Sequence, residues 1–217
     1  MHVVTIASPK GGTGKSTVTS ALAVRAAQES LRVAIIDLNA DQGSLTKWWI
    51  VRGEPMNPRL FPDPSDLIGD VELLRRDGWD WVFIDTPPAA SDLVELAILV
   101  ADAVIVPVRA SIFDFGSIEP IVEMCRQRRK PFAFLLSAAD SKFKKLTDIA
   151  VAALARDGPV LGTRISYRLP YINALTIGRT GPEVEKELAS EIDALWSEVK
   201  RLACSTSGRA EKGRPHV

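Results

Sequence analysis

The stretch that decides the fold is VVTIASPKGGTGKST, residues 3–17. It opens as a short apolar, β-rich run, turns into a glycine loop and ends at Lys15-Ser16-Thr17, and a helical pattern of small and apolar residues follows. A strand, a glycine loop and a helix in this order form a phosphate-binding geometry, because backbone N–H groups surround the oxygens and the helix N-terminus adds partial positive charge. In such a loop a lysine reaches the outer phosphates, and a hydroxyl such as that of Ser16 ligates Mg²⁺.

The spacing in this loop departs from the common pattern G-x-x-x-x-G-K-[ST], because Pro9 stands where that pattern has its first glycine. The sequence KGGTGKS, residues 10–16, instead resembles the deviant Walker A motif, KGGxGK[ST], of the ParA/MinD family of ATPases. The resemblance implies nucleotide contacts along the whole loop, by Lys10, Gly11, Gly12, Thr13, Gly14, Lys15, Ser16 and Thr17.

A second acidic position follows the apolar run Val33–Asp37. A carboxylate at the carboxyl end of a strand lies at the rim where doubly wound sheets bind ligands, although Asp and Asn also make turns and helix caps there. The segment resembles the family motif D-x-D-P-Q-G, whose second aspartate helps to place the attacking water. That position is Asn39 here, or Asp41 if one residue is inserted. Since asparagine cannot act as a base, hydrolysis is either slower than in relatives or dependent on Asp41.

A third motif is the run Trp81–Asp85, followed by Thr86-Pro87-Pro88. Four mostly apolar residues and then an aspartate resemble Walker B, whose carboxylate holds Mg²⁺. The resemblance implies that Mg²⁺ is arranged by Ser16, Asp37 and Asp85, and that Lys10, Lys15, Asp37, Asn39 and Asp41 are the catalytic candidates. Further along, Pro107-Val108-Arg109 and Asp114 match the family's layout as well, but no chemistry is assigned to them, and Asp114 fits a helix cap better.

Apolar strand candidates alternate with helical patterns along the chain, which favours βαβ units. The candidates are Val3–Ala7, Val33–Asp37, Trp81–Asp85, Ala103–Val108, Phe132–Ser137 and Val160–Ile165. Several are continuous apolar runs, as expected for parallel strands that are covered on both faces. The sequence therefore predicts an α/β fold with a doubly wound, mostly parallel sheet flanked by helices, of the P-loop NTPase type. We expect one ATPase domain over residues 1–204, an irregular Pro-rich segment at Pro55–Pro64 and a disordered tail at 205–217.

Composition limits the function classes. The 217 residues are 46% hydrophobic and carry a formal net charge of zero, so no global basic field attracts nucleic acid. The two cysteines, Cys125 and Cys204, are far apart, which offers no zinc-type spacing and suits a reducing compartment. The apolar region Leu93–Val108 is interrupted by charged residues and cannot span a bilayer, and we expect a cytoplasmic protein.

Basic residues form three clusters, each of which is either a solvated face or a local DNA contact. They are Arg126, Arg128, Arg129 and Lys130; Lys142, Lys144 and Lys145; and Arg164, Arg168 and Arg179.

The C-terminal helical pattern, Pro182–Ala203, carries one apolar stripe and an acidic polar face. MinD-type relatives end in a basic membrane anchor, whereas an acidic face is repelled by anionic lipid. We therefore expect this helix to pack on the domain, without stable membrane association.

The resemblance is closest to small ParA-type partition ATPases that lack an N-terminal DNA-reading domain. It implies that Lys15 binds the β- and γ-phosphates in its own subunit and that Lys10 reaches the partner's nucleotide across an ATP-dependent homodimer. It also implies non-specific binding of the ATP dimer to DNA, nucleoid association in that state, and a ParB-like activator protein that stimulates hydrolysis. The cargo would be a plasmid, a chromosome region or a protein assembly.

Other classes share these motifs. A MinD-like membrane-cycling ATPase and a metabolic ligase of the dethiobiotin synthetase type remain open, as does a nucleotide-gated scaffold with negligible turnover. An iron–sulfur reductase of the nitrogenase type shares the fold, but Cys125 and Cys204 do not match its two cluster cysteines. The segment Arg164–Ala174 lies where relatives approach the base, and no residue in it stands out as decisive.

Overall fold

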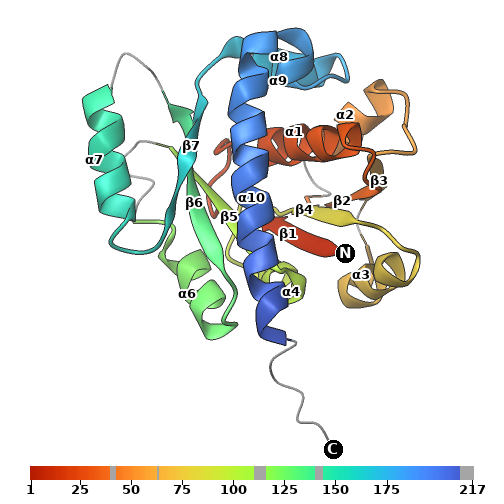
Figure 1. Cartoon of the computed structure of the whole chain (residues 1–217), viewed down its shortest axis with the longest axis horizontal. Helices are drawn as coiled ribbons and strands as arrows, with labels where there is room; N and C mark the ends of the chain where they lie inside the picture. Colours follow the sequence, from red (N-terminus) through yellow and green to blue (C-terminus); the bar gives the residue numbers. More distant parts are fainter. Residues whose placement is uncertain (40–42, 63, 110–115, 140–143, 211–217) are drawn as a thin grey trace, which may run out of the picture.

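A parallel β-sheet with seven strands among the described residues forms the centre of the molecule (Figure 1). This computed structural model describes residues 1–39, 43–62, 64–109, 116–139 and 144–210. The strand order is β3-β2-β4-β1-β5-β6-β7, and every neighbouring pair runs parallel. The strands are β1 (His2–Ile6), β2 (Val33–Asp37), β3 (Arg59–Pro62), β4 (Trp81–Asp85), β5 (Ala103–Arg109), β6 (Phe132–Ala139) and β7 (Val160–Ser166). The predicted doubly wound α/β fold is confirmed.

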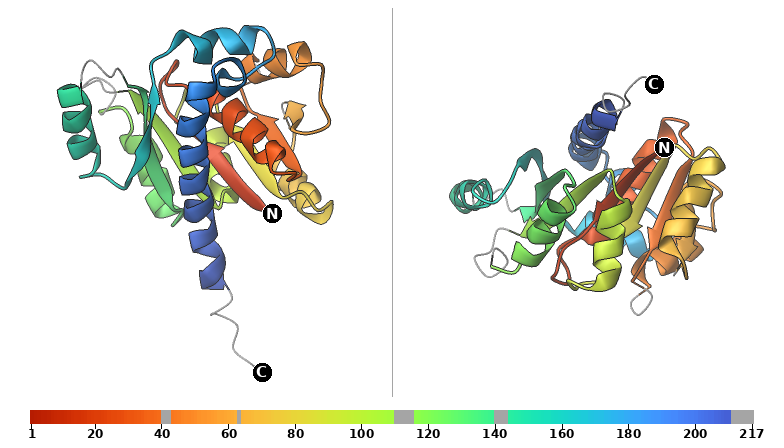
Figure 2. Two further views of the ribbon diagram at one scale, coloured as in Figure 1. Left: turned by 45° about the horizontal axis from the view of Figure 1, so that its top comes forward. Right: turned by 90° about the horizontal axis from the view of Figure 1, so that it is seen from below.

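Helices cover both faces of the sheet (Figure 2). One face packs against α1 (Lys15–Gln28), α2 (Ser44–Val51), α8 (Leu169–Thr176) and α10 (Ala189–Ala210). The other face packs against α3 (Leu67–Arg76), α4 (Asp92–Val100), α6 (Glu119–Gln127) and α7 (Lys144–Leu154). Because both faces are covered, all five residues of β2 and of β4 are buried, which explains their unbroken apolar sequences.

One strand lies where the sequence predicts none. β3 occupies part of the Pro-rich segment expected to be irregular, and it pairs with β2 from Ala34↔Arg59 to Asp37↔Pro62. The prediction was wrong because prolines argue against a central strand but are tolerated on an edge strand, where one side of the ladder needs no donors. β3 is such an edge.

The predicted C-terminal helix differs from the observed one at both ends. It is divided into α9 (Gly181–Val184), a 3₁₀ turn η2 (Lys186–Leu188) and α10, because Glu185 adopts an extended conformation. At its other end α10 continues to Ala210, so helix replaces the first six residues of the predicted disordered tail. Adding residues to a formed helix needs no new nucleus, which favours this extension. The remaining residues, 211–217, lie outside the described part of the chain.

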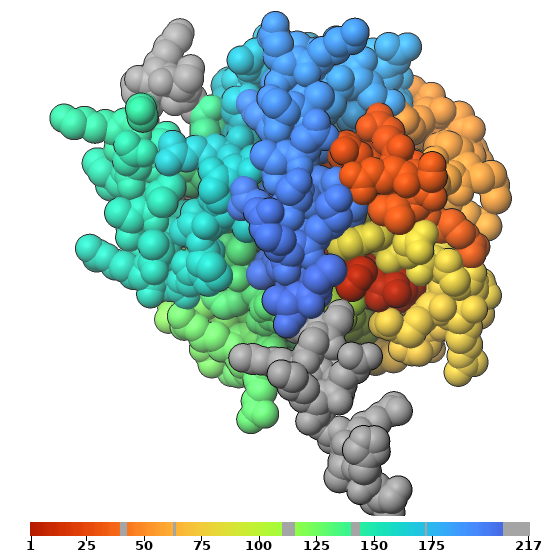
Figure 3. Space-filling view, viewed as in Figure 1, coloured from red at the N-terminus to blue at the C-terminus, as the bar shows by residue number. Residues whose placement is uncertain are grey.

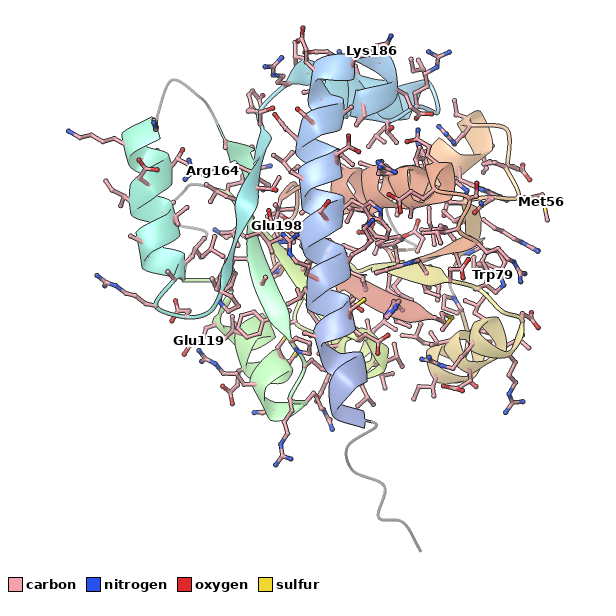
Figure 4. The ribbon with its side chains drawn as sticks, in the orientation of Figure 1. Met56, Trp79, Glu119, Arg164, Lys186 and Glu198 are labelled. Carbon is pink, nitrogen blue, oxygen red and sulfur yellow. The ribbon has the colours of Figure 1, made fainter. Side chains whose placement is uncertain are left out.

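The packing of α10 against the domain is confirmed. This helix, blue in Figure 3, crosses the face of the molecule beside α1, and Ile192, Leu195 and Val199 are fully buried against the sheet. Glu198, labelled in Figure 4, faces β7 and accepts hydrogen bonds from the backbone N–H groups of Gly162 (2.8 Å) and Thr163 (2.9 Å). Among the described helices, none is both long enough and apolar enough to cross a membrane.

Candidate nucleotide-binding site

The glycine loop leaves β1 near the middle of the sheet and ends where α1 begins at Lys15. Gly12 and Gly14 have φ angles of +70° and +91°, a conformation that residues with a Cβ rarely adopt. These two angles explain why glycine is needed at both positions. The loop lies at the carboxyl edge of the sheet, next to the point where the strand order reverses, which is the usual ligand position in doubly wound folds.

Lys15 is folded back beneath the loop. Its Nζ atom donates to the carbonyl oxygens of Ser8 (3.3 Å) and Lys10 (3.1 Å), and only 7% of the residue is exposed. Burial lowers the pKa of the Lys15 ammonium, and the negative charge of Asp85 opposes this effect. The lysine is therefore held inside the loop, where its charge is available to a phosphate chain. Lys10 is half-buried at the start of the same loop.

Asp85 ends β4 and meets the first turn of α1. Its Oδ2 atom accepts a hydrogen bond of 2.6 Å from the Ser16 hydroxyl, and Oδ1 accepts one of 3.4 Å from the Thr19 hydroxyl. Burial raises the pKa of Asp85 to about 7, and the nearby charge of Asp37 adds to the increase, whereas the Ser16 hydroxyl, Lys15 and Thr19 lower it. The predicted pair Ser16 and Asp85 is thus brought into contact.

Asp37 ends β2, directly across from Asp85 in the register of β2 and β4. Its Oδ1 atom accepts a hydrogen bond from the Asn39 N–H (3.0 Å), while Oδ2 accepts from the Thr46 N–H (3.1 Å) and the Thr46 hydroxyl (2.9 Å). Asp37 therefore caps the first turn of α2 from a distance, because the cap position itself is Gly43, which has no side chain. Asn39 is buried, and Asp41 lies outside the described residues.

The side chains near the loop carry the oxygen donors that the implied Mg²⁺ would need. Ser16, Asp37 and Asp85 supply one hydroxyl and two carboxylates, at the end of the loop and on two adjacent strands. Mg²⁺ prefers oxygen donors and is commonly held by one or two carboxylates together with waters and substrate phosphates. The residues fit this ion. Thr86, next to Asp85, is buried and donates its hydroxyl to the Ile6 carbonyl oxygen (3.0 Å), which joins the ends of β4 and β1.

A cleft of about 280 Å³ opens beside the loop. Its lining comes from the loop, α1, the ends of β5, β6 and β7, and α8, and includes Gly12, Thr17, Arg109, Ser137, Ser166 and Tyr171. Among the described residues, the hydroxyls of Ser137 and Ser166 are buried without a hydrogen-bond partner. Such groups are rare in proteins and suggest that a polar ligand satisfies them. Neither serine is predicted as a site residue from the sequence, because its only signal there is a position near the end of a strand.

Two of the three basic clusters contain ion-paired arginines. In the first cluster Arg128 pairs with Glu95 (2.6 Å), and in the third Arg164 pairs with Asp148 (3.2 Å) and Arg168 with Glu185 (2.6 Å). In the second cluster, Lys144 and Lys145 are exposed at the start of α7 and make no ion pair with another described residue, while Lys142 lies outside the described part.

Known proteins are similar to this chain over part or all of its length. The chromosome-partitioning ATPase Soj of Thermus thermophilus is 31% identical, with 51% of this chain and 55% of Soj covered. The protein ParA of Rhizobium radiobacter is 34% identical, with 52% of this chain and 51% of ParA covered. The chain thus spans about half the length of these curated relatives.

A solved structure extends the likeness to the whole fold. The septum site-determining protein MinD of Pyrococcus horikoshii, in complex with Mg-ADP, matches with a TM-score of 0.72 at 18% identity, covering 93% of this chain and 97% of MinD. A model of the CobQ/CobB/MinD/ParA nucleotide binding domain family matches residues 4–179, which include the glycine loop, both strand-end aspartates and the lining of the cleft. The chain belongs to the CobQ/CobB/MinD/ParA nucleotide-binding domain family.

Proposed function

We propose that this chain is a Mg²⁺-dependent ATPase that dimerises with ATP, binds DNA without sequence preference and drives the segregation or positioning of a plasmid, a chromosome region or a protein cargo. The observation that carries the proposal is the loop KGGTGKS, in which Lys15 lies beneath the backbone and Ser16 contacts Asp85. The curated relative Soj is, by its name, a chromosome-partitioning ATPase.

In the proposed mechanism, the loop N–H groups and Lys15 hold the phosphate chain, and Ser16, Asp37 and Asp85 hold Mg²⁺, which neutralises charge that develops on the phosphates. Lys10 reaches the nucleotide of the partner subunit. A cation supplied in this way acts like an arginine finger, which accelerates related reactions by about 10³–10⁵-fold. Asn39 or Asp41 orients the attacking water, and hydrolysis is slow until a ParB-like protein binds.

The two lysines of the loop give a direct test. Lys15→Ala should abolish ATP binding, measured by calorimetry, because the cation beneath the phosphates is lost. Lys10→Ala should leave ATP binding by the monomer intact but abolish the ATP-dependent dimer, measured by light scattering after size exclusion. Lys186→Ala, on the exposed turn η2, is the matched control. An ATP dimer formed by Lys10→Ala would contradict the shared-lysine mechanism.

DNA binding is tested separately with any duplex at low and moderate salt, without nucleotide and with ADP, ATP or a non-hydrolysable ATP analogue. We expect binding only in the ATP states and a steep loss with salt, because phosphate contacts release counterions. The slope of the logarithm of the DNA-binding constant against the logarithm of salt concentration reports the number of phosphate contacts. The double change Lys144→Ala and Lys145→Ala should reduce this slope by about one unit per lysine. Arg128→Ala, whose charge is already paired with Glu95, is the control. Binding to liposomes instead of DNA would favour membrane cycling.

A further inference from the structure

Arg109 is a cation at the glycine loop to which the mechanism above gives no role. It ends β5, the strand beside β1, and its Nη2 atom donates a hydrogen bond to the carbonyl oxygen of Gly12. A Cβ atom placed on Gly12 would lie 2.5 Å from this nitrogen, so the guanidinium packs directly against the loop. This contact joins two segments 97 residues apart.

The same side chain lines the cleft beside the loop, where the hydroxyls of Ser137 and Ser166 have no partner. The other arginine in the cleft lining, Arg168, is paired with Glu185 at 2.6 Å. Arg109 has no carboxylate within ion-pair distance among the described residues. Its positive charge is therefore directed at a site that contains unsatisfied polar groups and no described counter-charge of its own.

A guanidinium has five N–H donors in a planar fork, which matches the geometry of phosphate oxygens. The contact with Gly12 uses a donor on Nη2 and fixes the position of the plane, while the other donors remain for a ligand. If Lys15 binds the outer phosphates beneath the loop, the nucleoside lies in the cleft beside the loop. The phosphate attached to the nucleoside then lies where the loop and the cleft meet. Arg109 stands at this junction.

We propose that Arg109 is a nucleotide-binding residue that contacts the phosphate next to the nucleoside, with the Gly12 carbonyl oxygen holding its guanidinium in place. The assignment rests on the proposed nucleotide function. It makes a prediction that a purely structural brace on the loop would not make: the contribution of Arg109 is the same for every ligand that carries that first phosphate, whatever the length of the phosphate chain.

The test measures the affinities of adenosine, AMP, ADP and ATP by competition with a fluorescent ATP analogue. It compares the unchanged protein, Arg109→Ala, Arg109→Lys and the control Arg128→Ala, whose arginine pairs with Glu95 on α4. Arg109→Ala should weaken AMP, ADP and ATP by a similar factor of about ten, the loss expected for one charge-assisted contact, and leave adenosine unchanged. Arg109→Lys should recover part of this loss, because lysine keeps the charge without the fork.

Three results would overturn the assignment. Unchanged affinities in Arg109→Ala would show that the side chain does not contact the nucleotide. A loss confined to ADP and ATP would show that it acts only by shaping the loop around the outer phosphates. A loss that includes adenosine would point to the nucleoside instead. If the unchanged protein binds none of the four ligands, the proposed ATPase function fails together with this assignment, and that result is distinct from the other three.

Discussion

The ends of β2 and β4 place two aspartates side by side, and their surroundings give them different tasks. Asp37 and Asp85 are neighbours in the sheet register, and both are 1% exposed. Among the described residues, Asp37 receives two backbone N–H groups and one hydroxyl, whereas the Asp85 carboxylate receives the hydroxyls of Ser16 and Thr19. Hydroxyls rotate and can turn to another acceptor, but backbone donors are fixed by the fold.

This difference teaches that two equally buried carboxylates can have different surroundings. Asp37, beside its place in the proposed metal site, is a brace that holds the residues after it and the first turn of α2, so its removal should cost stability. Burial raises the pKa of Asp85 to about 7, because its negative charge is poorly compensated there without a bound cation. Stability is measured below as the free energy of unfolding in denaturant with a chelator present, and Mg-ATP binding is measured separately without the chelator.

The largest expected effect is the pH dependence due to Asp85. Between about pH 4 and pH 7 the folded protein keeps a proton that the unfolded chain releases, so this carboxyl makes the free energy of unfolding fall as pH rises, by up to about 4 kcal/mol. Asp85→Asn removes this contribution. The free energy of unfolding of the variant, compared with that of the unchanged protein, should therefore increase as the pH rises from about 4 to about 7. Asp37→Asn should show only a part of this trend, because loss of the Asp37 charge lowers the pKa of Asp85 without removing its carboxyl group. Equal pH profiles for the two variants would contradict the comparison.

A smaller effect is expected from Asp37→Ala at constant pH. The substitution leaves the N–H groups of Asn39 and Thr46 without their acceptor and removes the cap of α2, which should cost about 2–3 kcal/mol. Asp85→Ala is the matched substitution on the neighbouring strand. At pH 8 it should cost less, because it also removes a poorly solvated charge. A larger loss of unfolding free energy for Asp85→Ala than for Asp37→Ala would show that Asp85, and not Asp37, is the structural brace.

The smallest effects are expected from removing the hydroxyl that donates to each carboxylate, Thr46 for Asp37 and Ser16 for Asp85. Thr46→Ala should cost about 1 kcal/mol through the lost bond to Asp37 and leave Mg-ATP binding unchanged. Ser16→Ala should have little effect on unfolding but raise the pKa of Asp85 further and weaken Mg-ATP binding, because its hydroxyl both lowers that pKa and belongs to the proposed metal site. The same loss of Mg-ATP affinity in both variants would remove the distinction.

The sequence alone predicts the parts of the site that are continuous in the chain. The apolar runs before Asp37 and Asp85 predict strands that end at those residues, and the glycine loop predicts a helix that starts after it, whose Ser16 contacts Asp85 in the structure. These inferences succeed because strand burial and helix-terminus chemistry are local.

The parts that depend on the order of the strands were not predictable in this way. Arg109 reaches Gly12 only because β5 lies beside β1, and Ser137 and Ser166 line one cleft only because β6 lies beside β7. The brace from Asp37 to Thr46 likewise joins residues that are nine positions apart in the sequence. Residue types and their spacing do not show which distant segments become neighbours in the folded sheet.

The contact between α10 and β7 has a consequence for how copies of this chain meet. β7 is an edge of the sheet, and an edge strand offers unpaired N–H groups to any strand of another molecule. Glu198 occupies two of these donors from within the same chain, on Gly162 and Thr163. The helix therefore covers part of this edge and withdraws two donors that a strand of another copy would need for pairing.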